Sequence, residues 1–199
     1  MSINATGDSY ISDATFDAWM ETKLNDAYTD MRKGMDVSTQ RGDAQKALNE
    51  IKNQLLQMKT NGKDAHDVTA AMHAAIDKFS EAFPDVKKTL GEFADTLDRR
   101  GADAAAAAAA ASAPHFDQYG CWVVPLTPVS PDPVKLDEKE IDNWTKAIGD
   151  TVDAFGKEDQ LGLLSLNQLN SHINQTENIR SALSDSRNKT TDAIINRIG

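Results

Sequence analysis

The chain has 199 residues and a net charge of -10, and only 6% of its residues are aromatic. Nucleic acids and anionic membrane surfaces attract clustered lysine and arginine, but no basic run here exceeds two residues. Neither is therefore an expected partner. The single cysteine, Cys121, excludes an intramolecular disulfide, and no apolar run is long enough for a transmembrane helix.

Residues 1–12 are rich in serine, asparagine, aspartate and glycine, a composition that predicts a disordered N-terminus. They lack the basic and apolar regions of a cleaved signal peptide. Two locations stay open: the cytoplasm, or the exterior reached by an export route that reads an uncleaved N-terminus.

A long first helix is predicted over residues 13–60, because apolar residues recur there with helical spacing. Pairs of apolar residues in its second half are seven residues apart, as in a coiled coil. Leu24 and Met31 keep the same spacing on a shifted register, which predicts a coiled-coil stutter. The expected seam comprises Phe16, Trp19, Leu24, Met31, Leu48, Ile51, Leu55 and Met58.

The middle of the chain, residues 64–136, has a variable composition. Apolar stripes predict helices over roughly 64–99, with Pro84 opening the second of them. An alanine run follows and predicts a surface helix or a tether, since alanine favours helix but buries little surface. The stretch "HFDQYGCWVVPLTPVSPDP" then combines aromatic and β-branched residues with prolines, which predicts one short ribbon or extended segment.

A long last helix is predicted over residues 137–199, where no proline occurs. Three glycines predict a kink or break near 156–162. Beyond Leu169 the inward positions alternate between apolar and polar residues, and so marginal a helix needs contacts with other elements. The polar inward residues are Thr176, Arg180, Ser186 and Thr190. The expected apolar seam comprises Leu166, Leu169, Ile173, Ile179, Leu183, Ile194 and Ile198.

These patterns predict a mainly α fold. Its long N- and C-terminal helices pair as an antiparallel coiled coil, with a smaller helical middle region and a short β ribbon. Each paired helix would leave a face available to copies of the chain.

Motifs for catalysis or metal binding are absent from the sequence. The histidines and Cys121 occur at no metal-ligand or nucleophile spacing, and no phosphate-loop, dinucleotide or zinc-protease motif is present. The tripeptide 41–43, Arg-Gly-Asp, falls within an expected helix, so a cell-adhesion role is not expected. We expect no enzyme, no cofactor, and no catalytic, metal or cofactor-binding residue.

The stretch "LNQLNSHINQTENIRSALSDSRNKTTDAIINRIG", together with the long first helix, resembles the needle-tip and filament subunits of bacterial type III secretion systems, such as the EspA-like filament proteins. The resemblance is architectural and covers 13–60 and 137–199, while 64–134 has no counterpart. It implies a subunit that polymerises through its terminal helices into a conduit delivering effectors and translocators into host cells. Tip and filament both stay open.

The same resemblance implies partners and a location. The chain would bind copies of itself as a homo-polymer, the secretion needle and translocator proteins, and a cytoplasmic chaperone before export. It would be secreted or at the cell surface by an uncleaved-signal route, and cytoplasmic before export. On this hypothesis Leu183→Asp or Ile194→Asp abolishes assembly.

Two alternatives belong to other classes. A cytoplasmic helical adaptor or secretion chaperone would bind a partner helix along the same seam and form small oligomers without polymerising. A helical-bundle enzyme would need a polar cluster inside the bundle.

Overall fold

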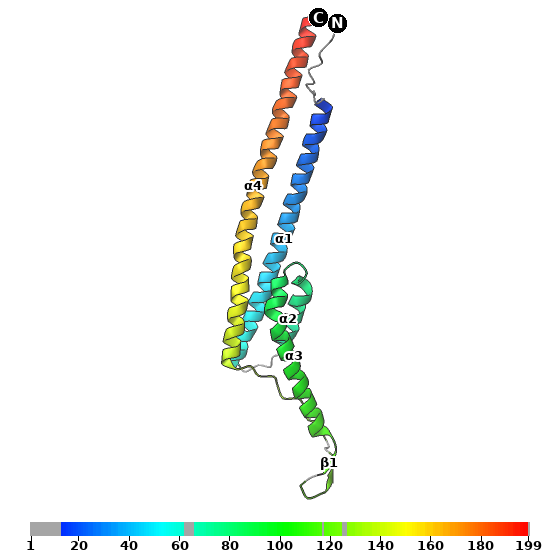
Figure 1. Cartoon of the computed structure of the whole chain (residues 1–199), viewed down its shortest axis with the longest axis vertical. Helices are drawn as coiled ribbons and strands as arrows, with labels where there is room; N and C mark the ends of the chain where they lie inside the picture. The colour runs from blue at the N-terminus through cyan, green and yellow to red at the C-terminus, as the bar shows by residue number, and fades with distance from the viewer. Residues whose placement is uncertain (1–12, 62–65, 117, 125–126, 199) are drawn as a thin grey trace, which may run out of the picture. The chain divides into compact units, whose positions relative to one another are not determined.

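The computed structural model describes residues 13–61, 66–116, 118–124 and 127–198. The predicted disordered N-terminus, 1–12, lies outside them. The described residues are 85% helical and form four helices and one two-stranded antiparallel sheet (Figure 1). The elements are α1 (Asp13–Asn61), α2 (His66–Phe79), α3 (Pro84–Ser112), β1 (His115–Phe116), β2 (Trp122–Val123) and α4 (Glu138–Ile198). The predicted mainly α fold, with long terminal helices packed against each other and a short ribbon, is confirmed.

The chain divides into two compact units, and both long helices contribute to each. Unit 1 comprises residues 1–38 and 160–199, of which the structure describes 13–38 and 160–198. Unit 2 comprises residues 39–159 and contains α2, α3 and the ribbon. The unit boundaries therefore fall inside helices, whereas the predicted segments ended where helices were expected to end.

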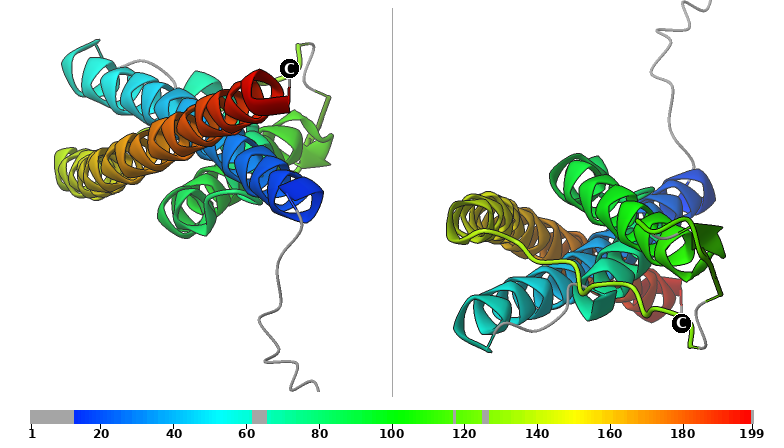
Figure 2. Two further views of the ribbon diagram at one scale, coloured as in Figure 1. Left: turned by 90° about the horizontal axis from the view of Figure 1, so that it is seen from above. Right: turned by 90° about the horizontal axis from the view of Figure 1, so that it is seen from below.

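Unit 2 packs four helical segments around one apolar core. α2 and α3 form a helical hairpin, drawn in green in the right-hand view of Figure 2. Aromatic contacts tie the hairpin to α4: Phe83 lies 5.3 Å from Phe155 and Phe93 stacks on Trp144 at 4.6 Å between ring centroids. The residues of α1 that enter this core are Ala44, Leu48, Ile51, Leu55 and Met58.

Helix α3 begins and continues as the sequence predicts. Pro84 occupies its first turn, where a missing N–H costs nothing and the fixed φ suits a helix. The alanine run belongs to the same helix, which ends at Ser112. Ala108 is buried, and most of the other alanines in the run are exposed.

Helix α4 runs uninterrupted through Gly149, Gly156 and Gly162, so the predicted break near 156–162 is wrong. Side chains of α1 lie near two of these glycines. A Cβ added at Gly149 would lie 3.2 Å from Nζ of Lys52, and one added at Gly156 would lie 3.9 Å from Nε2 of Gln45. Helix pairing thus offsets the low helix propensity of glycine, about 1 kcal/mol per residue.

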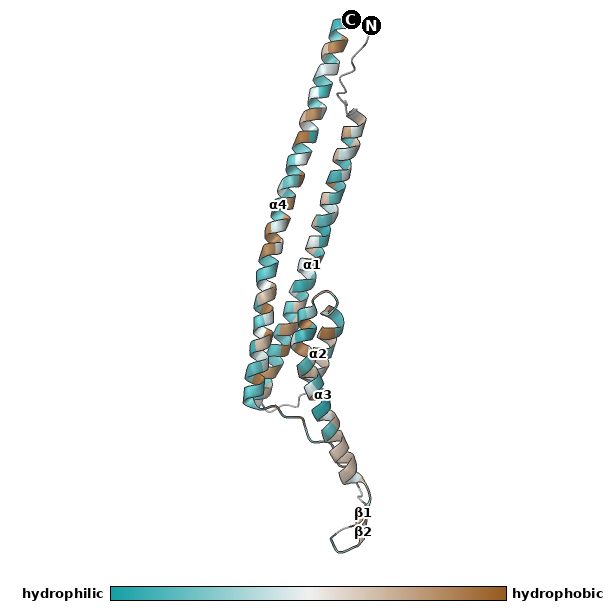
Figure 3. Ribbon diagram, in the orientation of Figure 1, coloured by the Kyte–Doolittle hydropathy of each residue, from teal (hydrophilic) through white to brown (hydrophobic). Residues whose placement is uncertain are grey.

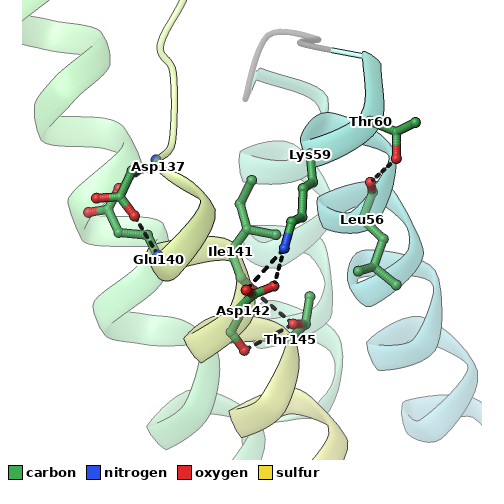
Figure 4. A network of polar contacts seen from close by, with 8 residues as sticks. All are labelled: Leu56, Lys59, Thr60, Asp137, Glu140, Ile141, Asp142 and Thr145. Carbon is green, nitrogen blue, oxygen red and sulfur yellow. Dashed lines mark hydrogen bonds and ion pairs between the residues drawn. The ribbon is translucent and has the colours of Figure 1, made fainter.

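A capping box starts α4 (Figure 4). The N–H of Asp137 donates to Oε2 of Glu140 at 3.1 Å, and the N–H of Glu140 donates to Oδ1 of Asp137 at 2.7 Å. Arg100 of α3 donates to both carboxylate oxygens of Glu140. One turn on, Lys59 of α1 donates to both oxygens of Asp142, at 2.8 and 3.0 Å. These contacts fix the start of α4 against α1 and α3.

The Glu140 contacts predict a specific acid sensitivity. The hydrogen bond from Arg100 holds the pKa of Glu140 below its ordinary value of 4.5. A lowered folded-state pKa stabilises the folded chain above the unfolded-state pKa, and this stabilisation is lost as pH falls through the folded-state pKa. Glu140→Gln keeps a capping acceptor but removes the charge. We expect it to lower the free energy of unfolding by about 0.5–1 kcal/mol at neutral pH and by less at pH about 3, measured by urea denaturation.

The matched control is Glu50→Gln, at an exposed carboxylate of α1. It removes the same charge without touching the capping box. If Glu140→Gln lowered the free energy of unfolding equally at both pH values, the predicted link between Glu140 ionisation and stability would be contradicted.

Candidate self-association surface

The helices of unit 1 pair through an unbroken heptad pattern. The inward positions of both helices alternate spacings of three and four residues, as in a coiled coil. On α1 the buried or half-buried residues at these positions are Asp17, Met20, Leu24, Ala27, Met31, Gly34 and Ser38. On α4 they are Gly162, Leu166, Leu169, Ile173, Thr176, Leu183 and Arg187, with exposed Arg180 in the same frame.

The register shift that was predicted along α1 appears in its burial pattern. Leu24 and Met31 occupy one inward position of the heptad, and Leu48 and Leu55 occupy the other inward position of the same frame. Ala44, Ile51 and Met58 are also buried but lie one residue away from the position that Leu24 and Met31 continue, so the register changes between the two parts of α1.

Three contacts fix the antiparallel register of unit 1. The hydroxyl of Tyr28 donates to Oε1 of Glu177 at 2.5 Å. Nη1 of Arg187 donates to Oδ2 of Asp17 at 2.6 Å. Gly34 lies opposite Leu166, because a Cβ added there would come within 2.8 Å of Cδ2 of the leucine.

The two polar contacts were not predicted. The hydrogen bond to the Glu177 carboxylate raises the pKa of Tyr28. The ion pair of Asp17 and Arg187 could have been predicted from the sequence, because the two residues carry opposite charges at inward heptad positions of two helices expected to pair.

The predicted seam residues do not form one continuous site. Four of them, Leu48, Ile51, Leu55 and Met58, lie in the core of unit 2, and the others belong to unit 1. In unit 1 the buried ones are Leu24 and Ile173, and the half-buried ones are Phe16, Met31, Leu166, Leu169 and Leu183. The exposed ones are Trp19, Ile179 and Ile194, while the side chain of Ile198 lies outside the described residues.

The polar stretch of the last helix is only partly covered. Thr176 is half-buried on the seam, whereas Arg180, Ser186 and Thr190 are exposed. In Figure 3, apolar residues in brown recur between hydrophilic ones along α4.

Unit 1 exposes more large apolar side chains than it buries. Among its described residues the buried apolar side chains are Met20, Leu24 and Ile173. The exposed large apolar side chains of the same residues are Trp19, Tyr28, Met35, Val37, Leu161, Leu163, Leu164, Ile179, Ile194 and Ile195. Two paired helices bury one face each, so apolar residues on the other faces need further neighbours.

These exposed residues are densest in a stretch of six residues of α4, "LGLLSL", residues 161–166. Leu166 faces α1, while Leu161, Leu163 and Leu164 point to other sides and are 67%, 49% and 57% exposed. A helix that is apolar all round is normally buried. Next to Gly34, at the same level of α1, two more apolar side chains are exposed. We name the set of Met35, Val37, Leu161, Leu163 and Leu164 the apolar belt.

Alanine substitutions at Gly34 and Gly42 test the close approach of α1 and α4 at Leu166. Gly42→Ala meets nothing within 4 Å, so its better helix propensity should raise the free energy of unfolding by about 0.5–1 kcal/mol. Gly34→Ala should bring no such gain, because its Cβ would force Leu166 to another rotamer, which costs about 0.5–1.5 kcal/mol. Urea denaturation of both variants measures the difference, and equal stabilisation would contradict the predicted contact.

Other chemistry-bearing residues make structural contacts. Nε2 of His73 lies 2.8 Å from Oδ2 of Asp98. Arg41 of the Arg-Gly-Asp tripeptide pairs with Glu158 and lies over the ring of Phe83 at 5.7 Å. In the part of the chain that the structure describes, no group of three or more histidine, cysteine or acidic residues could hold a metal ion.

Across the described ranges, no helix has both the length and the apolar character needed to cross a membrane. The candidate surface of unit 1 is a paired-helix surface with exposed apolar faces. No protein-family model matches the sequence, and no curated protein or solved structure matches it.

Proposed function

We propose that the chain is a self-assembling structural subunit that polymerises through its terminal helices. The observation that carries this proposal is the apolar belt, where helix α4 carries leucines on several sides and only one side is covered by α1. Contact with further helices would remove these leucines from water.

The distribution of exposed residues favours copies of the chain over one partner helix. A single partner helix needs one apolar groove, as in helix-in-groove recognition. Unit 1 instead exposes apolar residues on several sides of the belt. It exposes more near the other end of the pair, at Trp19, Ile194 and Ile195. A subunit that contacts several neighbours through different surfaces makes heterologous contacts, which grow into a helical filament when they do not close.

The specific assembly we propose is an extracellular filament or needle tip of a type III secretion system, acting as a conduit for effectors and translocators. Its support is the pairing of a long first helix with a long, polar last helix, as the resemblance implies. On this proposal the chain is exported, needs no cofactor, and meets needle and translocator proteins outside the cell and a chaperone inside it.

Electron microscopy of the purified chain across a concentration series tests the proposal. Long, uniform fibres that appear above a critical concentration are the expected result. Discrete small particles at every concentration, with one sedimentation coefficient, would contradict polymerisation and favour the adaptor or chaperone. Mixing the chain with a matched bacterial secretion needle distinguishes a tip subunit from a filament subunit, since a tip subunit caps needles without forming free fibres.

A further inference from the structure

The ribbon after α3 forms a short aromatic hairpin, which we define by its described residues 115–116 and 118–124. His115 pairs with Val123 and Phe116 with Trp122. The rings of Phe116 and Trp122 meet edge to face at 4.8 Å. Gly120 turns the hairpin with φ +76°, a left-handed conformation that glycine adopts without strain.

The apolar side chains of the hairpin are uncovered. Phe116 is 67% exposed, Tyr119 81%, Trp122 59% and Val124 56%. Neighbouring strand residues point to opposite faces, so Trp122 and Val123 present apolar groups on both sides of the ribbon. An isolated hairpin of two residues per strand is only marginally stable in water. Contacts with an apolar environment would therefore stabilise it.

Charge is nearly absent around the hairpin. Between Asp103 and Asp132 the sequence contains one charged residue, Asp117, and no lysine or arginine. The end of α3 that leads to the hairpin is alanine, pale brown in Figure 3. Because the residues that flank the hairpin are uncharged, the hairpin can leave water without burying charged side chains.

We propose that the aromatic hairpin inserts into the interfacial region of a zwitterionic lipid bilayer. Tryptophan and tyrosine, with an apolar ring and a polar group, favour this region. A protein groove covers one face of a ribbon, whereas the lipid interface surrounds both, which matches apolar groups on both faces. The hairpin has no cation to attract anionic lipids, and the chain carries a net charge of -10, so binding depends on apolar contact.

Cys121 allows a direct test, because it is the chain's only cysteine and is exposed on the hairpin. The full chain is labelled there with the environment-sensitive dye NBD and mixed with phosphatidylcholine vesicles. The expected result is a blue-shifted, brighter emission that persists at high salt and is quenched by lipids spin-labelled near the headgroup. Co-sedimentation of the unlabelled chain with the same vesicles checks that the dye does not cause binding.

Two variants complete the test. The double variant F116S/W122S should weaken vesicle binding at least about tenfold, since it removes two large apolar anchors. The matched variant L163S/L164S, in the apolar belt, should bind vesicles like the parent chain. That control separates lipid binding from self-assembly, so either proposal can fail alone.

Three results would overturn the proposal. One is an emission unchanged by vesicles. Another is binding that requires anionic lipids and disappears with salt. The third is a blue shift produced by unlabelled copies of the chain without lipid, which would assign the hairpin to a contact between copies.

Discussion

The double substitution Leu163→Asp and Leu164→Asp is expected to keep the chain from assembling at concentrations at which the parent chain forms fibres. Both side chains belong to the apolar belt and are about half exposed in the isolated chain. Burying one large aliphatic side chain in a contact contributes about 1.5–3 kcal/mol, and burying an unpaired carboxylate there is strongly unfavourable. Sedimentation velocity and electron microscopy measure the loss.

The control for this prediction lies a few residues further along α4. Asn167→Asp with Gln168→Asp adds the same two charges at exposed positions without removing an apolar group. It should assemble nearly as the parent chain does. Both double variants should retain the helical circular dichroism of the parent, because neither changes the seam with α1. Fibres formed normally by the Leu163→Asp, Leu164→Asp variant would rule out the belt as an assembly contact.

The single substitutions Leu183→Asp and Ile194→Asp, suggested by the sequence, test different contacts. Leu183 is half-buried on the seam, so an aspartate there would also weaken the pairing of α1 with α4. Ile194 is 53% exposed, and its replacement therefore reports on contacts with other molecules.

Phe155→Ala should cause a large loss of stability. The ring is 2% exposed, lies in the core of unit 2 and contacts Phe83. Truncation of a buried phenylalanine leaves a cavity and costs about 3–5 kcal/mol. Urea denaturation followed by circular dichroism should show this decrease in the free energy of unfolding.

Phe116→Ala makes the same chemical change at a ring that is 67% exposed. It should alter the free energy of unfolding by less than about 1 kcal/mol. Similar losses in the two variants would show that Phe155 is not held in a packed core.

Local features of the chain could be read from its sequence. Apolar spacing and the absence of proline predicted the two long helices, and Pro84 predicted the start of α3, because both depend on residues close together in the chain. The antiparallel pairing of the long helices also followed, since each carries an apolar stripe that one partner can cover. The ribbon was predicted from its composition, and its Trp122 is 59% exposed.

Burial along the two long helices was decided by the tertiary structure. Leu55 is fully buried because α2, α3 and α4 surround the second part of α1 in unit 2. Trp19 and Leu163 are also large apolar residues but lie in unit 1, where two helices cover only one face of each other. Helical periodicity fixes which residues share a face, but how many faces are covered depends on how many helices meet at that level, and that number is set by contacts between residues far apart in the sequence.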